Sequence, residues 1–326
     1  MEAKETSENQ SPGPRAPETI SPSAYALLKM KAHTSIPYVR EAAELVDAVQ
    51  ITDLAAGIDI DPTDYWLRVM HFESRYNSID QLLQDLPATN ILEISSGFSF
   101  RGLDLSNKKD VFYIDTDLPN IVATKQRFID AFKTPNAQGP SALAASPGSA
   151  GPSGQAPGHY ELQPLNALDP TAFDAIIAKF PPGPITILNE GLLVYLDDQQ
   201  KSQLCANIHR ALQTRGGAWI TADIYIKRKE GEDSRSDAWC AWSREHALEE
   251  KKFESFEEAG TFFQKRGFQK EKEATQDYSR LTSFPQFLKA TGPKGINQLR
   301  SPGRKRLQST WLLAPTIIPP SNSSPD

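Results

Sequence analysis

The chain has few cysteines and no long hydrophobic run, and each shortage narrows its class. Its two cysteines, Cys205 and Cys240, stand at no metal-ligand spacing, so we expect no bound metal. A disulfide framework is not expected either, which indicates a reducing compartment and a cytoplasmic protein. No apolar run reaches the roughly 18 residues of a membrane helix, and the first residues hold no apolar signal-peptide core. We therefore expect no membrane association.

Hydrophobic residues are also scarce, at 39% of the sequence, and 25 prolines are spread through it. This composition indicates ordered structure interrupted by unfolded segments. We predict three such segments: a polar tail at 1–21, a low-complexity insert at 134–158 rich in Gly, Ala, Pro and Ser, and a polar tail at 316–326. The remainder, 22–315, is expected to form one domain.

Net charge and missing glycine motifs exclude further classes. With a formal net charge of −6, the chain has no global attraction to nucleic acid, and the local basic stretch "SPGRKRLQ" lacks interleaved aromatic residues. Neither a G-x-G-x-x-G motif nor a Walker lysine is present, which disfavours a dinucleotide-dependent oxidoreductase. We expect no nucleic-acid partner.

The hydrophobic pattern changes near residue 90. Between 22 and 89 the apolar residues follow helical spacing, and Asp61 before Pro62 predicts a helix start. From residue 90 onward, β-prone runs such as "NILEIS", "VFYID" and "AWITADIYI" alternate with helical segments of about 10 to 15 residues. This alternation predicts an α/β fold with a largely parallel sheet and an N-terminal helical cap at 22–89.

Polar residues gather where the predicted strands end. Open parallel sheets bind ligands outside the carboxyl ends of their strands, so these residues are candidates for a binding site. The set comprises Ser95, Ser96 and Gly97 after the first strand, Asp115 and Asp117 after the second, Asn166 and Asp169 after the third, and Asn189 and Glu190 after the fourth. Glu190 lies between two apolar runs, where a carboxylate needs a partner.

The first two strand ends suit a cofactor that contains adenosine. Gly97 lets the backbone approach a ligand closely, and an acid about 20 residues later can accept hydrogen bonds from ribose hydroxyls. Because the glycines of a pyrophosphate cradle are missing, a cofactor without phosphates fits better. We therefore predict S-adenosylmethionine (SAM) as the cofactor.

Six stretches support this prediction through a family resemblance. They are "LLKMKAHTS", "ESRYNSIDQLL", "ILEISSGFSFRGL", "YIDTDLPNIVATKQ", "LNEGLLVYL" and "STWLLAP", in this order from about residue 24 to residue 315. Together they resemble the leucine carboxyl methyltransferase family, which includes polyketide carboxyl methyltransferases of the tetracenomycin type. The resemblance implies a Rossmann-like class I SAM-dependent O-methyltransferase with a mostly parallel, seven-stranded sheet.

The resemblance also implies roles for individual residues. Arg75 matches the arginine that holds the methionine carboxylate of SAM, and Lys31 matches a basic residue that helps to close the site. The other implied cofactor contacts are Ser95 and Gly97 at the methionine and ribose, Asp117 or Asp115 at the ribose hydroxyls, Asn166 near the adenine, and Glu190 from the fourth strand.

The sequence departs from the family pattern at three places. Ser95-Ser96-Gly97 replaces a glycine-alanine-glycine turn, Ser99 replaces an aspartate that often follows, and Asn166 replaces an aspartate. These departures motivate an alternative hypothesis, in which the chain is a catalytically inactive methyltransferase-fold interaction scaffold.

The expected acceptor is a carboxylate of a small molecule. Methyl transfer from a sulfonium is an in-line displacement, and a carboxylate, with a pKa near 4, needs no base for it. A hydroxyl acceptor needs a base, for which the candidates Tyr195, Asp223 and His246 stand at no diagnostic spacing. Trp239 and Trp242 either face the acceptor or pack the cap against the sheet.

Overall fold

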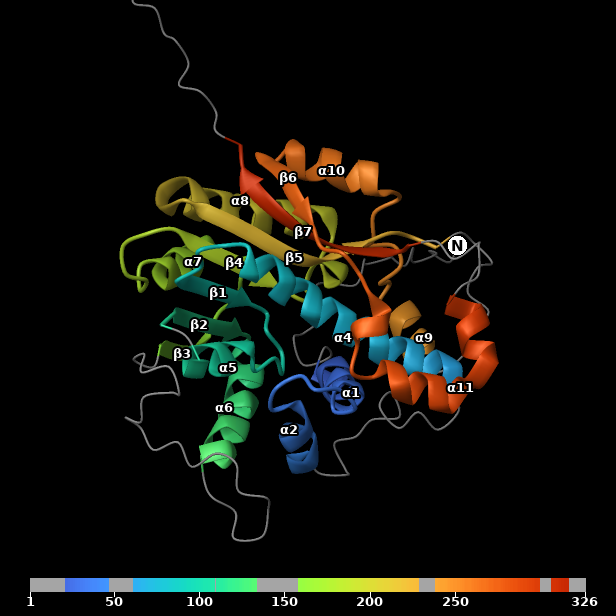
Figure 1. The fold of residues 1–326 in the computed structure, drawn as a ribbon. Coiled ribbons are helices and arrows are strands. Elements are labelled where there is room, and N and C mark those ends of the chain that lie inside the picture. Colours follow the sequence, from blue (N-terminus) through green and yellow to red (C-terminus); the bar gives the residue numbers. More distant parts are fainter. Residues whose placement is uncertain are drawn as a thin grey trace, which may run out of the picture.

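A computed structural model describes residues 21–46, 61–108, 110–133, 158–228, 238–299 and 306–316. Its centre is a seven-stranded sheet in the order β3-β2-β1-β4-β5-β7-β6 (Figure 1). The strands are β1 (Asn90–Ile94), β2 (Phe112–Asp117), β3 (His159–Pro164), β4 (Ile185–Asn189), β5 (Gly217–Tyr225), β6 (Phe268–Glu273) and β7 (Gln308–Pro315). The first five pair in parallel, and β7 lies antiparallel between β5 and β6. This is the predicted α/β fold, with a mostly parallel, seven-stranded sheet.

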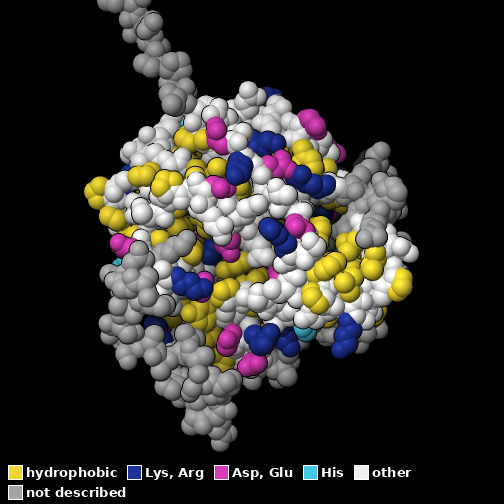
Figure 2. Space-filling model, in the orientation of Figure 1, with side chains coloured by type: hydrophobic (Ala, Val, Ile, Leu, Met, Phe, Trp, Pro, Cys, Tyr) yellow, Lys and Arg dark blue, Asp and Glu magenta, His cyan; other side chains and the backbone are white. Residues whose placement is uncertain are grey.

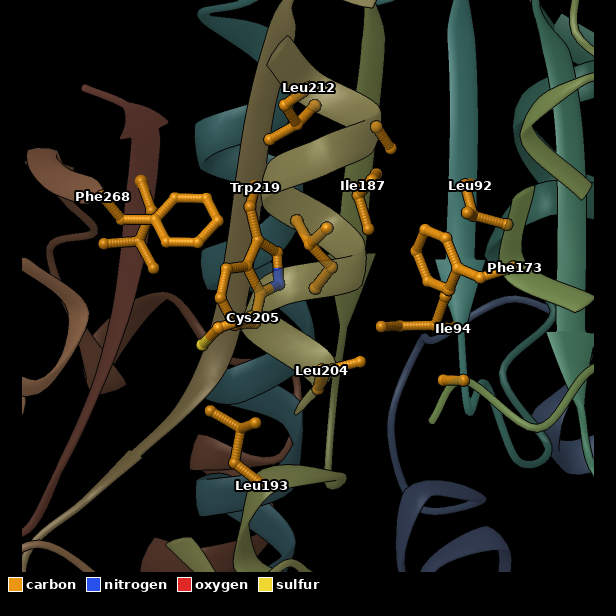
Figure 3. Packing of buried hydrophobic residues seen from close by; sticks show 14 of the residues in the cluster. Leu92, Ile94, Phe173, Ile187, Leu193, Leu204, Cys205, Leu212, Trp219 and Phe268 are labelled. Atoms are coloured by element: carbon orange, nitrogen blue, oxygen red, sulfur yellow. The ribbon is translucent and has the colours of Figure 1, made fainter. Parts of the chain in front are cut away.

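One face of the sheet packs against α7 (Pro170–Ile177), α8 (Asp198–Arg215) and α10 (Phe256–Gln264). Because side chains of a strand alternate between faces, Ile187 of β4 and its partner Trp219 of β5 both contribute to this core. Figure 3 shows them beside Leu204 and Leu212 of α8. The burial of these apolar side chains fixes the register of the central strands.

The opposite face packs against the long helix α4 (Pro62–Gln84). Here the next residues of the same strands, Leu188 and Ile220, form a core with Ile79 and Leu82 of α4. Helix α11 (Phe284–Leu299) in turn packs on α4 through Phe287. The helix that carries Arg75 is thus held between the sheet and an outer helix.

The first part of the predicted cap at 22–89 consists of α1 (Ser21–Lys31) and α2 (Val39–Leu45), and α4 forms its last part. Helix α2 packs beside α6 (Pro119–Lys133) (Figure 1). Leu28 of α1 and Val39 of α2 contribute to a core with Phe98 and Phe100, which follow β1. The bulky phenylalanines of the "GFSF" stretch therefore anchor the cap close to the glycine turn.

Capping residues define several helix boundaries. Asp61 caps α4 by accepting a hydrogen bond from the Thr63 N–H at 2.8 Å, as Asp61-Pro62 predicts. Ser255 caps α10, and Gly216 ends α8 with a φ of 73°. Asp169, predicted to lie at a strand end, caps α7 instead by accepting from Thr171 and Ala172.

Some elements were not predicted, and some predictions lie outside the described residues. Strand β6, which has a charged sequence, and the short helix α5 (Arg101–Lys108) were not predicted. The remaining elements are η3 (Leu193–Tyr195), α9 (Ala238–Glu245) and η4 (Tyr278–Arg280), the last of which precedes α11. The segments 1–20, 134–157 and 317–326 lie outside the described residues, so the predicted tails and insert stay predictions.

The surface has no single-sign patch on the face shown in Figure 2, where basic and acidic side chains are interspersed. Within the described ranges, no helix combines the length and apolar character required to cross a bilayer.

Candidate functional site

The candidate site lies at the carboxyl edge of the sheet, where the ends of β1, β2, β4 and β5 meet. In a parallel sheet these ends share one edge, so residues distant in sequence become neighbours. Two groups of polar side chains assemble there. One surrounds the turn after β1, and the other surrounds Glu190 after β4.

The turn after β1 has an unusual backbone. Both Ser95 and Gly97 lie in the left-handed region, with φ of 51° and 54°. A side chain in this region costs roughly 1–2 kcal/mol, which explains why glycine suits the position that Ser95 holds. A Cβ added to Gly97 has nothing within 4 Å, so the turn borders open space on that side. The half-buried Gly97 leaves room for a ligand against its backbone.

Asp117 holds this turn in place. Its Oδ2 accepts from the Gly97 N–H at 2.6 Å, and its Oδ1 accepts from the Leu118 N–H at 2.7 Å. Burial raises the pKa of Asp117 to about 6, although both N–H groups favour the ionised form. Asp117 therefore joins the first two strand ends and titrates near neutral pH.

Asp115 is directed differently from Asp117. Its Oδ2 lies 2.6 Å from Nζ of Lys125, and the Tyr160 hydroxyl donates to the same oxygen. Lys125 also donates to the Ser96 hydroxyl at 2.9 Å, so this fully buried lysine supports the turn from below. Among the described residues, Oδ1 of Asp115 has no hydrogen-bond partner. Lys125, in the middle of an amphipathic helix, was not predicted as a site residue.

Arg101 supports the other side of the turn and was also not predicted as a site residue. Its guanidinium donates to Glu93 at 3.0 Å and to Asp80 at 2.7 Å, and stacks on the Tyr76 ring at 3.9 Å. The Tyr113 hydroxyl donates to the other oxygen of Glu93 at 2.6 Å. The carboxylate inside the first apolar strand was the available signal, because a buried Glu93 requires a cationic partner.

Gly102→Ala is expected to lower the free energy of unfolding by about 1–3 kcal/mol because it overpacks this support. A Cβ at Gly102 would lie 2.4 Å from the Tyr113 ring and 2.8 Å from the Tyr160 ring. Neither ring can move freely, since their hydroxyls are bonded to Glu93 and Asp115. Urea unfolding measures the effect. Gly260→Ala, whose Cβ meets nothing within 4 Å, is the matched control, and an equal loss in both variants would contradict the argument.

Glu190 gathers the second group of side chains. Its Oε1 accepts from Lys31 Nζ at 2.6 Å, from Arg75 Nε at 3.1 Å and from Arg75 Nη2 at 3.0 Å. Arg101 Nη2 lies 3.8 Å from its Oε2. Two sequence-predicted cations, from α1 and α4, thus both bond to the sequence-predicted Glu190 that follows β4.

The charges of this group are buried and closely coupled. The Lys31, Arg75 and Glu190 side chains are 9%, 5% and 4% exposed. Burial alone raises the pKa of Glu190, but Lys31, Arg75 and Arg101 outweigh it and lower the pKa to about 2. Burial lowers the pKa of Lys31, and Glu190 opposes that shift. Oε2 of Glu190 accepts no hydrogen bond from the described residues, so one buried carboxylate oxygen is available to a donor.

Asp223, a predicted candidate base, anchors the loop that carries Glu190. Asn189 Nδ2 donates to it at 2.7 Å, and it accepts from the N–H groups of Gly191, Leu192 and Leu193 at 2.6, 2.6 and 3.1 Å. Burial raises its pKa, whereas Arg75 and these N–H groups lower it. With four donors at 1% exposure, Asp223 is committed to holding the backbone.

Tyr225 and His71 extend the second group beyond Arg75. Arg75 Nη1 donates to the Tyr225 hydroxyl oxygen at 2.9 Å, and His71 Nε2 lies 2.8 Å from the same oxygen. Burial raises the pKa of Tyr225 to about 12. Neither residue was predicted; a tyrosine ending a strand and a histidine one turn before Arg75 gave no signal by themselves.

The remaining predicted residues lie at the same edge without joining either group in the contacts above. Asn166 is exposed, and its side-chain oxygen accepts from the Leu168 N–H at 3.1 Å. Tyr195 packs edge-on against Trp242 at 6.2 Å. His246 stacks on Trp242 at 4.3 Å, so this tryptophan packs within the α9 region. The side chain of Trp239 lies outside the described residues.

Comparison with known proteins gives distant likenesses. No protein-family model matches the chain. No curated protein matches it either. Among solved structures, magnesium protoporphyrin IX methyltransferase (ChlM) from Synechocystis PCC 6803 with bound SAH is 11% identical, with a TM-score of 0.41 over 86% of this chain and 93% of that one. PigF with SAH is 12% identical, with a TM-score of 0.43 over 92% and 72%.

A third solved structure, LepI in complex with SAM, is 12% identical, with a TM-score of 0.41 over 70% of this chain. The chain spans 43% of the length of that protein. The strand order of the sheet, rather than these likenesses, defines the fold.

Proposed function

We propose that the chain is a SAM-dependent O-methyltransferase of the leucine carboxyl methyltransferase type. In this proposal residues 22–315 form one cytoplasmic methyltransferase domain, and the acceptor is a carboxylate of a small molecule. The observation that carries the proposal is the pairing of an open glycine turn with a cluster of two cations and a carboxylate at one edge of this sheet.

The glycine turn suits the nucleoside end of the donor. Open space beside Gly97 accommodates a ligand against the backbone, and Asp117, already bonded to Gly97, is placed to accept ribose hydroxyls. Ser95 borders the same turn. Asp115 is the less favoured ribose ligand because it is fully buried, whereas Asp117 is 7% exposed. Asn166 is the proposed contact near the adenine.

The Glu190 cluster suits the amino-acid end of the donor. Arg75 and Lys31 would hold the carboxylate, and the unpartnered Oε2 of Glu190 would accept the ammonium. A zwitterion adds one charge of each sign, so it preserves the charge balance of a buried cluster, whereas a phosphate group adds net negative charge. The residues present therefore fit SAM.

When bound, SAM supplies an electrophilic methyl group on a sulfonium. The chain's own contribution is to orient the donor and to exclude water, since the side chains of the cluster are almost fully buried. A carboxylate acceptor is ionised at neutral pH and needs no proton transfer, so the proposed reaction requires no base from the protein.

Calorimetric titration with SAM and with S-adenosylhomocysteine tests the proposal. We expect one-to-one binding of both by the full chain, and transfer of a labelled methyl group to carboxylic acids. Asp117→Asn should weaken binding by about 100-fold, because it removes charge-assisted hydrogen bonds to the ribose. The exposed Asp130→Asn is the matched control and should bind like the unmodified chain. Binding that is equally strong in both variants would contradict the assignment.

Donor affinity is expected to fall as the pH drops through about 6, the pKa of Asp117. Protonation removes an acceptor that the ribose requires, so each pH unit below this value costs up to about tenfold in affinity. The effect on folding has the opposite sign: because the pKa lies above the ordinary 3.8, protonation of this group between pH 6 and 3.8 favours the folded state. Titration between about pH 5 and pH 8 measures the slope. A flat profile would exclude Asp117 as ribose ligand.

A second candidate function is a catalytically inactive scaffold. One observation favours it: Glu190 already satisfies both Lys31 and Arg75, so the donor must share an occupied pair of cations. The strained Ser95 and the exchanged Asn166 add to it. Absence of binding heat with SAM and S-adenosylhomocysteine, in a sample shown to be folded, would favour this function over the first.

A further inference from the structure

The contacts of Arg75, Tyr225 and His71 define a direction for hydrogen bonding. Arg75 can only donate, so the Tyr225 oxygen accepts its Nη1–H at 2.9 Å. The same oxygen lies 2.8 Å from Nε2 of His71, and either atom of this pair can be the donor. When the Tyr225 O–H is the donor, His71 accepts at Nε2 as a neutral imidazole that carries its proton on Nδ1. A neutral imidazole that accepts a hydrogen bond at its basic nitrogen can act as a general base there.

This pair lies beside the proposed donor site rather than within it. Tyr225 ends β5, next to β4, which carries Glu190 at its end. His71 precedes Arg75 by one turn of α4, so both lie on one side of that helix. Tyr225 and His71 are half-buried, whereas Arg75 and Glu190 are almost fully buried. The more accessible end of the chain of contacts thus faces away from the donor anchor.

Tyr225 also touches the group that holds the donor. Because one guanidinium, Arg75, contacts both Glu190 and Tyr225, a molecule that meets Tyr225 lies one side chain away from the proposed anchor of the donor's amino-acid end. No residue predicted from the sequence has this position: Asp223 is occupied by four donors, and Tyr195 packs against Trp242.

We propose that Tyr225 and His71 form a proton relay that lets the same site methylate a phenolic or enolic hydroxyl, in addition to a carboxylate. The inference rests on the proposed function, because it requires a bound methyl donor. Phenols and enols are the class that matches the relay, because a phenol's own pKa, about 10, is closer to that of a tyrosine side chain than an aliphatic alcohol's is. An aliphatic alcohol is too weak an acid for a tyrosine to accept its proton.

The acceptor O–H bond breaks and its proton moves to the Tyr225 oxygen, while the Tyr225 proton moves to Nε2 of His71, which becomes an imidazolium. The acceptor oxygen uses the released electron pair to form the new O–CH3 bond, and the S–CH3 pair stays on sulfur. Half-buried His71 then returns its proton to solvent. A carboxylate acceptor carries no proton and bypasses the relay.

Hydroxybenzoic acids test the relay, because each offers a phenol and a carboxylate in one molecule. With the full chain and SAM, mass spectrometry separates the methyl ether from the methyl ester. We expect both products, and an ether-to-ester ratio that falls by about 100-fold or more in His71→Asn and in Tyr225→Phe. His159→Asn on the exposed edge strand is the matched control and should leave the ratio unchanged. Exogenous imidazole should restore ether formation in His71→Gly.

A second readout does not depend on turnover. Long-range nitrogen–proton NMR of His71 should show a neutral ring protonated at Nδ1, and Tyr225→Phe should shift its tautomer balance or its titration. An Nε2-protonated ring, or ester without ether when the donor is bound, overturns the relay. Absence of both products with bound donor also overturns it, whereas failure to bind SAM at all overturns the proposed function instead.

Discussion

Arg75→Ala is expected to lower the free energy of unfolding by about 3–5 kcal/mol and to abolish donor binding. The substitution leaves Glu190 buried with one fewer cation, and an uncompensated buried charge is far more costly than the loss of an exposed pair. It also removes one of the two partners of the Tyr225 hydroxyl, the other being His71. Chemical unfolding monitored by circular dichroism measures the loss.

The double variant Arg75→Ala/Glu190→Gln separates charge from packing. If the stability lost in Arg75→Ala comes from a buried carboxylate that has lost a cation, neutralising Glu190 restores much of that stability. The two substitutions then couple strongly in a double-mutant cycle. Arg210→Ala, which breaks an exposed pair with Asp174, is the matched control and should cost less than about 1 kcal/mol. Additive losses in the cycle would show that Glu190 does not depend on Arg75.

The same pair predicts the acid limit of the fold. The pKa of Glu190, about 2, lies below its ordinary 4.5. Its ion pairs therefore stabilise the fold fully above about pH 4.5, and this contribution is lost as the pH falls toward 2. In Glu190→Gln that part of the acid dependence should disappear.

Asp223→Ala is expected to cost more than about 4 kcal/mol, since each buried donor left without an acceptor costs about 1–3 kcal/mol. Asn189 and the N–H groups of Gly191, Leu192 and Leu193 all lose their acceptor. The loop that positions Glu190 would then be free to move, so donor binding should fall as well. Thermal unfolding and calorimetry measure both effects.

The conservative variant sharpens the test on Asp223. Asp223→Asn keeps one acceptor oxygen but turns an N–H toward the backbone donors, so we expect an intermediate loss of stability. Were Asp223 a base instead, the asparagine variant would keep its stability and lose only methyl transfer to hydroxyls. Normal stability in both variants would refute the anchoring role.

Apolar strand runs allowed much of the fold to be predicted. "NILEIS", "VFYID" and "AWITADIYI" form buried strands as predicted, because only a covered parallel sheet removes such runs from water. Strand β6, "FQKEKE", could not be predicted from its side chains, since four of its six residues are exposed and β7 pairs with its backbone. Helix α11 is interrupted at Gly292, whose φ of 54° breaks the helical pattern.

The sequence predicted several residues of the site but not the contacts among them. The structure brings Lys31, Arg75 and Glu190 together across 159 and 115 residues of sequence, and their cofactor roles stay predictions. Composition alone does not reveal that the carboxylate neutralises the cations. Likewise, Tyr225 and His71 are neighbours because α4 packs across β5. Apolar residues of both elements, outside the site, determine that packing.

The position of β7 bears on how the protein is made. This strand lies between β5 and β6, although both precede it in the chain. Until the ribosome has added Gln308 and the residues after it, β6 has no strand to pair with. One edge of β5 then also has no neighbouring strand. Phe263, which packs on Trp311, and Trp219, which contacts Phe263 in the same core, would be partly uncovered in that interval. Nascent chains stalled there should thus be the form most dependent on chaperones, and release of one late strand completes the sheet.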